Sequence, residues 1–277
     1  MFLRRLILLA LMTAAAGRPG PAPRYDLWHI LGPGGGGTMI GPTISPHDPN
    51  LVVEHCDMTG AYITKDGGQS WRMFNLRGVV TTFAFDPRNS SVIYAGNRAL
   101  WKSEDRGKSW RMVFPNPTKN TVEHMRGDHA DYVLTSDDPS YPAGASIEAI
   151  AVDPADSKRI CLGLSPASGS SLQSARLYTS RDQGGTWEQI GEFPKDRILA
   201  IHIPGKAVLA KGEIYLIGIT SVHVLTAGRW EHRNGPSGAS IQQVSVGRAG
   251  EGAPPRVYRE GGATQLTGSS SIPRLGG

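Results

Sequence analysis

The chain has 277 residues, of which 39% are apolar and 19% are charged, with 35 glycines and 20 prolines. This composition excludes a mainly helical protein and favours many short strands joined by tight turns. Residues 1–16 hold two arginines and no acid, so the formal charge of +5 becomes +3 without them. A surplus this small and this scattered argues against a nucleic-acid-binding protein.

The first sixteen residues have the pattern of a secretory signal peptide. Arg4 and Arg5 precede an apolar run over residues 6–12, and three alanines at 14–16 supply a small-residue cleavage site. The run is too short to span a bilayer, and no later segment reaches the ~20 apolar residues of a membrane helix. The sequence therefore predicts a secreted or periplasmic protein without stable membrane insertion. An uncleaved anchor is the alternative.

Nearly the same eight letters occur three times along the chain: TKDGGQSW at 64–71, SEDRGKSW at 103–110 and SRDQGGTW at 180–187. Asp66 and Asp105 are 39 positions apart, and Asp105 and Asp182 are 77 apart, close to twice that interval. An Asp-Pro or similar turn precedes each box, with its aspartate 18, 19 or 29 residues before that of the box. A fixed period of about forty residues indicates a repeat architecture.

Between these markers the sequence alternates as short strands do, so each repeat is typical of a four-stranded antiparallel blade of an all-β β-propeller. We expect blades at residues 38–77, 78–115, 146–193 and 197–235, and a fifth that begins near residue 239. The propeller would occupy residues 17–246 and carry an inserted loop at 116–145. The tail at 247–277, rich in Gly, Pro and Arg, is expected to be irregular, either disordered or changed by a truncated or shifted reading frame.

The two cysteines fall at equivalent positions of the first and third blades. Cys56 lies eight residues after Asp48, and Cys161 lies eight residues after Asp153. A whole blade between them exceeds the ~7 Å Cα separation that a disulfide allows. We expect two free, buried thiols.

Each box combines residue types that suit a tight turn. A short carboxylate can accept hydrogen bonds from backbone N–H groups, glycine adopts a conformation that other residues resist, and the tryptophan ring covers the apolar side. The pattern resembles the Asp-box, or BNR repeat, of sialidases, family 74 xyloglucanases, sortilin-type receptors and photosystem assembly factors. That resemblance implies a structural role at the blade edge, away from the central pocket. The residues concerned are Asp66, Gly68, Trp71, Asp105, Gly107, Trp110, Asp182, Gly184 and Trp187.

A more specific resemblance covers residues 34–71. A Gly-rich start, an Asp-Pro-Asn turn and an Asp-x-x-Gly-Ala-Tyr segment occur there in the order found in the opening blade of family 74 glycoside hydrolases. The resemblance implies that Asp57 is one of two catalytic carboxylates, and Tyr62 is a candidate sugar-stacking residue. In that family the second carboxylate lies in a second propeller, for which this chain is too short. The second carboxylate must then be supplied locally, or the gene model is incomplete, or the protein binds without cutting.

The inserted loop is where we expect a second carboxylate to lie, because long loops of propellers often line the ligand face. Asp128 and Asp131 are the candidate second carboxylates, and His129 and Tyr132 are candidate substrate-binding residues. A solvated surface loop is the alternative. No metal-ligand spacing is present, so we expect neither a metal nor a cofactor.

Two functions remain open at this point. The first is an exported glycoside hydrolase that acts on a β-linked polysaccharide with Asp57 as the acid or base. The second is a non-catalytic propeller that binds a glycan, a peptide or a protein partner, as the sortilin and assembly-factor relatives imply. The substrate, the number of blades in a closed ring and the oligomeric state stay undetermined by the sequence.

Overall fold

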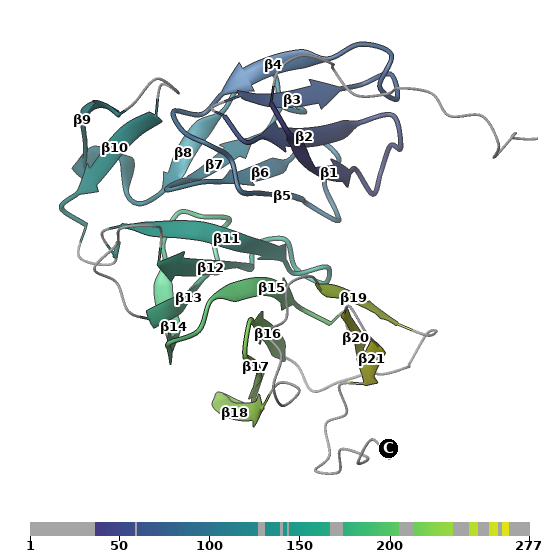
Figure 1. The fold of residues 1–277 in the computed structure, drawn as a ribbon, viewed down its shortest axis with the longest axis vertical. Coiled ribbons are helices and arrows are strands. Elements are labelled where there is room, and N and C mark those ends of the chain that lie inside the picture. The colour runs from purple at the N-terminus through teal and green to yellow at the C-terminus, as the bar shows by residue number, and fades with distance from the viewer. Residues whose placement is uncertain are drawn as a thin grey trace, which may run out of the picture. The chain divides into compact units, whose positions relative to one another are not determined.

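The structure is a computed structural model. It describes residues 37–58, 60–126, 131–138, 141–142, 144–166, 174–204, 213–234, 244–248, 255–259 and 262–265. Within these ranges it describes side chains except those of 121–135 and from 233 onward. The described part is β-structure apart from a single 3-10 turn, η1 (Pro117–Lys119) (Figure 1). The signal-peptide prediction for residues 1–16 lies outside it.

Four of the sheets are four-stranded, antiparallel and formed by consecutive strands, as the period predicts. Blade one contains β1 (Met39–Ile44), β2 (Val52–Cys56), β3 (Gly60–Thr64) and β4 (Arg72–Asn75). Blade two contains β5 (Thr82–Phe85), β6 (Ile93–Gly96), β7 (Leu100–Ser103) and β8 (Arg111–Phe114). Blade three contains β11 (Ala145–Val152), β12 (Ile160–Pro166), β13 (Ser174–Ser180) and β14 (Glu188–Pro194). Blade four contains β15 (Ile198–His202), β16 (Ile214–Gly218), β17 (Ser221–Thr226) and β18 (Arg229–Asn234). The prediction of an all-β propeller of four-stranded blades is confirmed.

The antiparallel order gives every blade two different ends. The loops between strands one and two and between strands three and four lie at one end, which we call the box end because it carries residues 65–71 of the first Asp-box. The loop between strands two and three lies at the opposite end, which we call the site end because in blade one it begins with Asp57. The boxes and Asp57 therefore occupy opposite ends of their blades.

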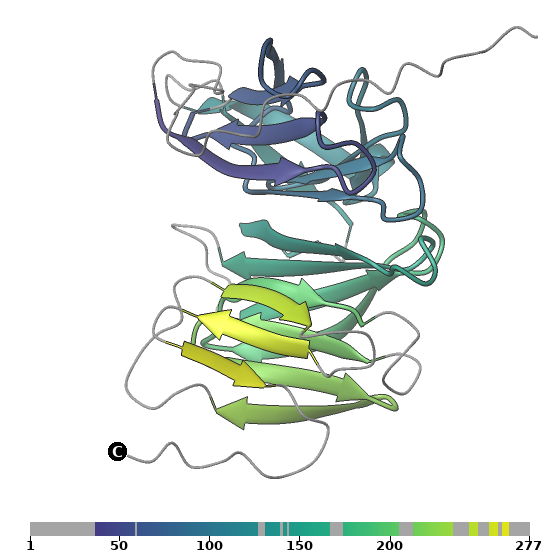
Figure 2. The same ribbon diagram turned by 90° about the vertical axis from the view of Figure 1, so that its right-hand side faces the viewer.

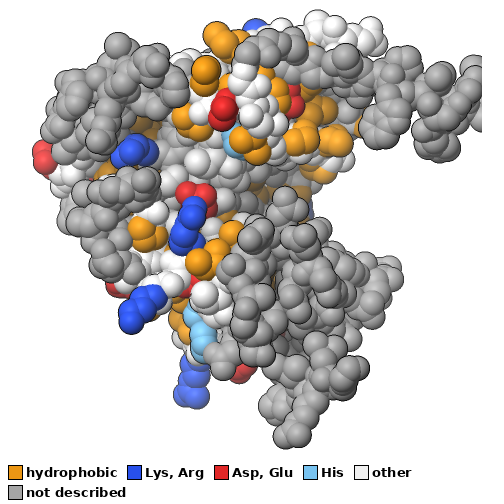
Figure 3. Space-filling view, viewed as in Figure 1, with side chains coloured by type: hydrophobic (Ala, Val, Ile, Leu, Met, Phe, Trp, Pro, Cys, Tyr) orange, Lys and Arg blue, Asp and Glu red, His pale blue; other side chains and the backbone are white. Residues whose placement is uncertain are grey.

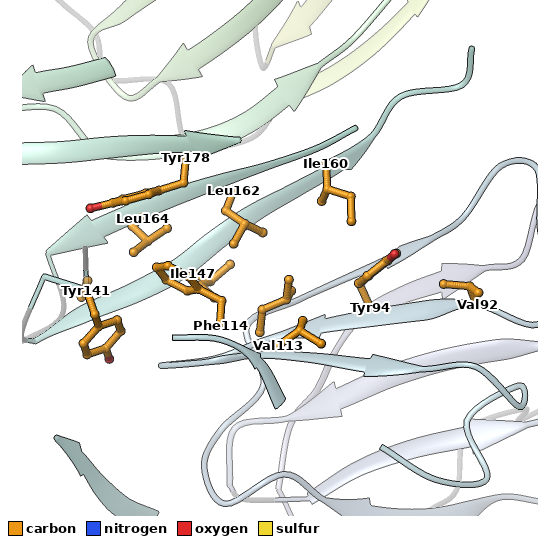
Figure 4. Packing of buried hydrophobic residues seen from close by; sticks show 12 residues of the cluster. Val92, Tyr94, Val113, Phe114, Tyr141, Ile147, Ile160, Leu162, Leu164 and Tyr178 are labelled. Carbon is orange, nitrogen blue, oxygen red and sulfur yellow. The ribbon is translucent and has the colours of Figure 1, made fainter. Parts of the chain in front are cut away.

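Neighbouring blades are joined by apolar clusters. Figure 4 shows the cluster between blades two and three, where Phe114 of β8 meets Ile147 of β11 and Tyr178 of β13. Similar clusters join blade one to blade two and blade three to blade four. Gly96 ends β6 and Gly163 lies within β12, and each faces the next blade. A Cβ at Gly96 would lie 2.8 Å from Ile147, and a Cβ at Gly163 would lie 2.7 Å from Ile198. Glycine at these positions permits the close packing of blades.

The inserted segment is more regular than the sequence predicts. Its backbone forms an antiparallel pair of strands, β9 (Asn120–Arg126) and β10 (Asp131–Ser136), instead of a loop throughout. The alternation of NTVEHMR and DYVLTS is a strand signal, but neither stretch carries the markers that define the repeat.

A fifth sheet follows blade four and has three described strands, β19 (Val244–Arg248), β20 (Pro255–Arg259) and β21 (Gly262–Gln265), which Figure 2 shows side by side. The fifth repeat expected from near residue 239 corresponds to this sheet. Strands β20 and β21 lie inside residues 247–277, so that segment is not irregular throughout. Its Val257 and Tyr258 favour a strand, but they stand among glycines and arginines, so the segment as a whole does not have the composition of a strand.

Large exposed apolar side chains are concentrated in blade one. Ile40, Ile44, Met58 and Met73 are 42, 61, 44 and 60% exposed. In Figure 3, orange side chains are grouped over this part of the molecule.

Cys56 and Cys161 are both buried and free, as predicted.

Candidate functional site

The three boxes share one hydrogen-bonded turn. In the first, Oδ1 of Asp66 accepts from the Thr64 hydroxyl at 2.7 Å and from the Ser70 amide at 2.9 Å. Its Oδ2 accepts from the Ser70 hydroxyl at 2.5 Å, and the Gly68 amide donates to the Thr64 hydroxyl at 2.9 Å. The same bonds recur around Asp105 with Ser103 and Ser109, and around Asp182 with Ser180 and Thr186. Both oxygens of each carboxylate are therefore used inside the turn.

The backbone explains why glycine stands two residues after the aspartate of each box. Gly68, Gly107 and Gly184 have φ values of 92, 75 and 94°, which L side chains rarely adopt. Gly107 also packs tightly on blade one, because a Cβ there would lie 2.6 Å from Cδ1 of Ile63. The turn is thus fixed by its own residues and by the neighbouring blade.

The same hydrogen bonds keep the box carboxylates ionised. Donation from the Ser70 hydroxyl and amide, with the Thr64 hydroxyl, lowers the pKa of Asp66 to about 2. The Ser109 side chain and amide hold the pKa of Asp105 well below its usual range, and the Thr186 amide lowers that of Asp182. A carboxylate whose oxygens are both occupied and whose charge is stabilised is a poor general acid or base at neutral pH. This geometry supports the structural interpretation of the boxes.

Asp57 has a different setting at the site end of blade one. It is exposed, and its Oδ1 accepts from the Thr38 amide at 2.9 Å and from the Cys56 thiol at 3.3 Å. Its own amide donates to the Thr38 carbonyl at 3.1 Å, which extends the pairing of β1 with β2. Gly37 lies against this carboxylate, since a Cβ there would come within 2.7 Å of Oδ1. The chain thus holds an accessible carboxylate in a fixed position.

Two buried ionisable residues precede Asp57 in β2, and the sequence did not single them out. Glu54 is 7% exposed, and burial raises the pKa of its carboxyl. His55 is 8% exposed, and burial lowers the pKa of its ring. Within the described part of the chain, Oε1 of Glu54 and Nδ1 of His55 have no hydrogen-bond partner. Buried polar atoms without partners are uncommon and concentrate at functional or strained positions.

Tyr62 lies opposite Glu54 in β3, in register with it, and opposite Met73 in β4. The Tyr62 side chain is half-buried. It therefore lies in the strand that follows the Asp57 loop, five positions after Asp57.

The candidate residues of the insertion are only partly described. Asp128 and His129 lie outside the described residues, and Asp131 and Tyr132 are described as backbone at the start of β10. The base of the insertion contacts the site end of blade two, where the Tyr141 hydroxyl donates to the Arg98 carbonyl at 2.9 Å. The Asn116 amide also donates a hydrogen bond to Oδ2 of Asp138 at 3.2 Å. The insertion is therefore rooted at the site end, the end that carries Asp57 in blade one.

A second polar cluster, which the sequence also did not reveal, occupies the site end of blade four. The Ser221 hydroxyl donates to Oδ2 of Asp196 at 2.5 Å and lies 2.8 Å from Nε2 of His223. Asp196 and His223 are 27 positions apart, and the pairing of β15 with β16 and of β16 with β17 brings them together. The cluster is not a nucleophilic triad, because the carboxylate contacts the serine and the Nε2 side of the ring instead of Nδ1.

Among the described residues, no group of three or more His, Cys, Asp or Glu side chains is placed to hold a metal ion. Nor does any helix in this part of the chain combine the length and apolar character needed to cross a bilayer.

Comparison with known proteins agrees with this geometry. Residues 100–113, around the second box, match the family model described as the BNR-Asp box repeat. A xyloglucanase of a Paenibacillus species is 24% identical over 275 aligned residues, which cover 91% of this chain and 23% of that protein. A xyloglucanase of Acetivibrio thermocellus is 25% identical over 190 residues, covering 61% of this chain and 20% of that protein.

The crystal structure of an ancestral enzyme of glycoside hydrolase family 74 overlays with a TM-score of 0.58 at 20% identity, over 88% of this chain and 33% of that chain. The chain thus spans about a quarter or less of the length of the curated relatives it matches. The structural likeness shows the fold, and the family model identifies its repeat. The chain is therefore an Asp-box β-propeller with sequence similarity to xyloglucanases.

Proposed function

We propose that this chain is a glycan-acting propeller module in which Asp57 serves as the acid or base toward a β-linked glucan. The observation that carries the proposal is the contrast between Asp57 and the box aspartates. Asp57 is an exposed carboxylate at the site end, held by the amide of Thr38, which precedes the neighbouring strand, whereas each box carboxylate lies at the box end and has both oxygens bound within its own turn. Similarity to two xyloglucanases supports a glycan as the ligand.

Hydrolysis with inversion needs one carboxylic acid to protonate the leaving oxygen and one carboxylate to activate water, ~6.5–9.5 Å apart. Asp131 and Asp128 are the proposed partners, because the insertion that carries them is rooted at the site end. Tyr62, Tyr132 and His129 are the proposed sugar contacts, since aromatic rings offer an apolar face for a sugar ring and a polar atom at their rim.

Secretion is part of the proposal. A signal peptide at residues 1–16, ahead of the propeller, would deliver this module to extracellular polysaccharide. The sequence pattern of the first sixteen residues supports this division.

The second candidate is a propeller that binds a glycan or a protein without cutting it. The same exposed carboxylate and aromatic residues would then contact the ligand without catalysis.

The test is hydrolysis and binding of xyloglucan by the purified chain, its Asp57→Asn variant and an Asp156→Asn control. Asp156 is an exposed aspartate at the box end of blade three. Loss of a general acid or base should reduce the rate by about 10²–10⁴-fold in Asp57→Asn and leave the control unchanged. Binding without hydrolysis, weakened in Asp57→Asn alone, would select the second candidate. Equal behaviour of all three proteins would refute a role for Asp57.

A further inference from the structure

Two histidines face each other across the outer strands of blade four. His223 of β17 and His232 of β18 are directly opposite in register. Their Nδ1 atoms are 3.4 Å apart, and their ring centroids are 4.8 Å apart. His232 is exposed, whereas the His223 side chain is only 12% exposed and packs against Phe193 with ring centroids 4.4 Å apart. One imidazole is therefore held in place, and the other is open to solvent.

The surroundings of His223 determine which ring nitrogen carries its proton. Asp196 is buried, and its Oδ2 accepts the Ser221 hydroxyl proton at 2.5 Å. The Ser221 oxygen is then left to accept from Nε2–H of His223, 2.8 Å away. With the proton on Nε2, the Nδ1 lone pair of His223 points toward His232.

Asp196 is held in place by two backbone amides. Its Oδ1 accepts from the Arg197 amide at 2.9 Å and from the Thr220 amide at 3.3 Å. Gly218 packs directly on the carboxylate, and a Cβ there would come within 2.2 Å of Oδ2. The anion and the serine are thus fixed beneath the histidine.

We propose that Nδ1 of His223 and Nδ1 of His232 together bind a divalent transition-metal ion, with Zn²⁺ as the representative case. Two imidazole nitrogens that share a tetrahedral Zn²⁺ at ~2.0–2.1 Å are about 3.3–3.4 Å apart. The observed separation of 3.4 Å matches this value. Small ring rotations would bring both lone pairs onto one ion.

The chain Asp196–Ser221–His223 is the kind of support that metal-binding histidines have. Such histidines donate their second ring N–H to a carboxylate, either directly or through another group, which fixes the tautomer and the ring orientation. Here the serine hydroxyl transmits this interaction, because Nε2 of His223 is 3.7 Å from Oδ2 of Asp196. Asp196 and Ser221 are therefore positioning residues, and the two histidines are the ligands.

The chemistry of the donor pair limits the kind of ion. Imidazole nitrogen suits Zn²⁺, Cu²⁺ and Ni²⁺, whereas Mg²⁺ and Ca²⁺ prefer oxygen ligands. Because the described residues supply no third His, Cys, Asp or Glu ligand, water or a small ligand would complete the coordination shell. We expect an exchangeable site instead of a closed structural one.

The test is isothermal titration of the metal-free full chain with Zn²⁺, supported by the visible absorption of bound Co²⁺. The wild type should bind one ion, and His232→Ala, which alters an exposed side chain, should lose saturable binding. Ser221→Ala keeps both ligands and should weaken binding by about 10–100-fold. Glu231→Gln, an exposed neighbour of His232 in β18, is the matched control for local charge and should bind like the wild type.

Circular dichroism and thermal melting would establish that each variant is folded. Absence of Zn²⁺ binding by the wild type, or unchanged binding by folded His232→Ala, overturns the site. Unchanged binding by Ser221→Ala overturns the supporting role of Ser221 and Asp196. Loss of binding in Glu231→Gln equal to that in His232→Ala would assign the effect to surface charge and also overturn the proposal.

Discussion

The indole Nε1 of Trp187 donates a hydrogen bond of 3.2 Å to the carbonyl of Val113 in the preceding blade. Trp230 makes the corresponding bond to Ile190 at 2.7 Å. Trp110 stacks on Phe74 with ring centroids 5.2 Å apart, but its buried Nε1 has no partner among the described residues. Trp110, Trp187 and Trp230 therefore join blades, and they do so by two different contacts.

This difference predicts unequal costs for the same substitution. Trp187→Phe should destabilise the protein by about 1–2 kcal/mol beyond the loss of ring area, because it leaves the Val113 carbonyl without this donor. Trp110→Phe removes an N–H group that already lacks a partner, so it should cost less while keeping an aromatic ring against Phe74. Urea unfolding of the two variants measures the difference. Equal losses would contradict the importance of the hydrogen bond between blades.

The box carboxylates predict a specific acid sensitivity. The pKa of Asp66 is lowered from 3.8 to about 2 by its hydrogen bonds, so its stabilising contribution is present above pH 3.8 and lost as the pH falls toward 2. Asp66→Asn should melt at a lower temperature than the wild type at pH 7, and the gap should narrow between about pH 4 and pH 2. The exposed Asp156→Asn serves as the control. A gap that stays constant with pH would show that the charge of Asp66 is not involved.

The repeat could be predicted from sequence because each box is self-contained. The hydrogen bonds to the Asp66 carboxylate and to the Thr64 hydroxyl all come from residues 64–70, so a short motif carries the turn and fixes the boundary between strands three and four. The strand pair at residues 120–136 lacks such a motif, which is why it was expected to be a loop. The pair His223 and His232 depends on the register of β17 with β18, which is set by the two-residue turn at Ala227 and Gly228. That turn lacks the Asn-Gly or Asp-Gly signal that would mark a hairpin in the sequence.

Both cysteines should be protected from thiol reagents until the protein unfolds. Cys161 is 0% exposed, and burial raises the pKa of its thiol to about 11, so little reactive thiolate is present at pH 8. Cys56 is 3% exposed. We expect slow labelling by a thiol-specific chromogenic reagent in the native state and two thiols per chain in denaturant. A Cys56→Ser variant would isolate Cys161, and rapid native labelling of that variant would contradict its burial.

Glu54 predicts an effect of the opposite sign to that of Asp66. Burial raises the pKa of its carboxyl, so the folded state favours the protonated form. Its contribution to stability is therefore fully present below the unfolded pKa of about 4.5 and is lost as the pH rises through the higher folded value. Replacing Glu54 with the neutral, similarly sized glutamine should remove this loss.

We expect Glu54→Gln to be more stable than the wild type at pH 7 to 8, because burying a carboxylate charge costs more than burying a neutral amide. The two proteins should converge near pH 4, where the wild-type carboxyl is protonated in both states. Thermal melts across this range measure the effect, and Glu188→Gln in β14, an exposed carboxylate, controls for net charge. A Glu54→Gln variant that is less stable than the wild type at pH 7 would mean that the charged carboxylate is stabilised in the folded protein.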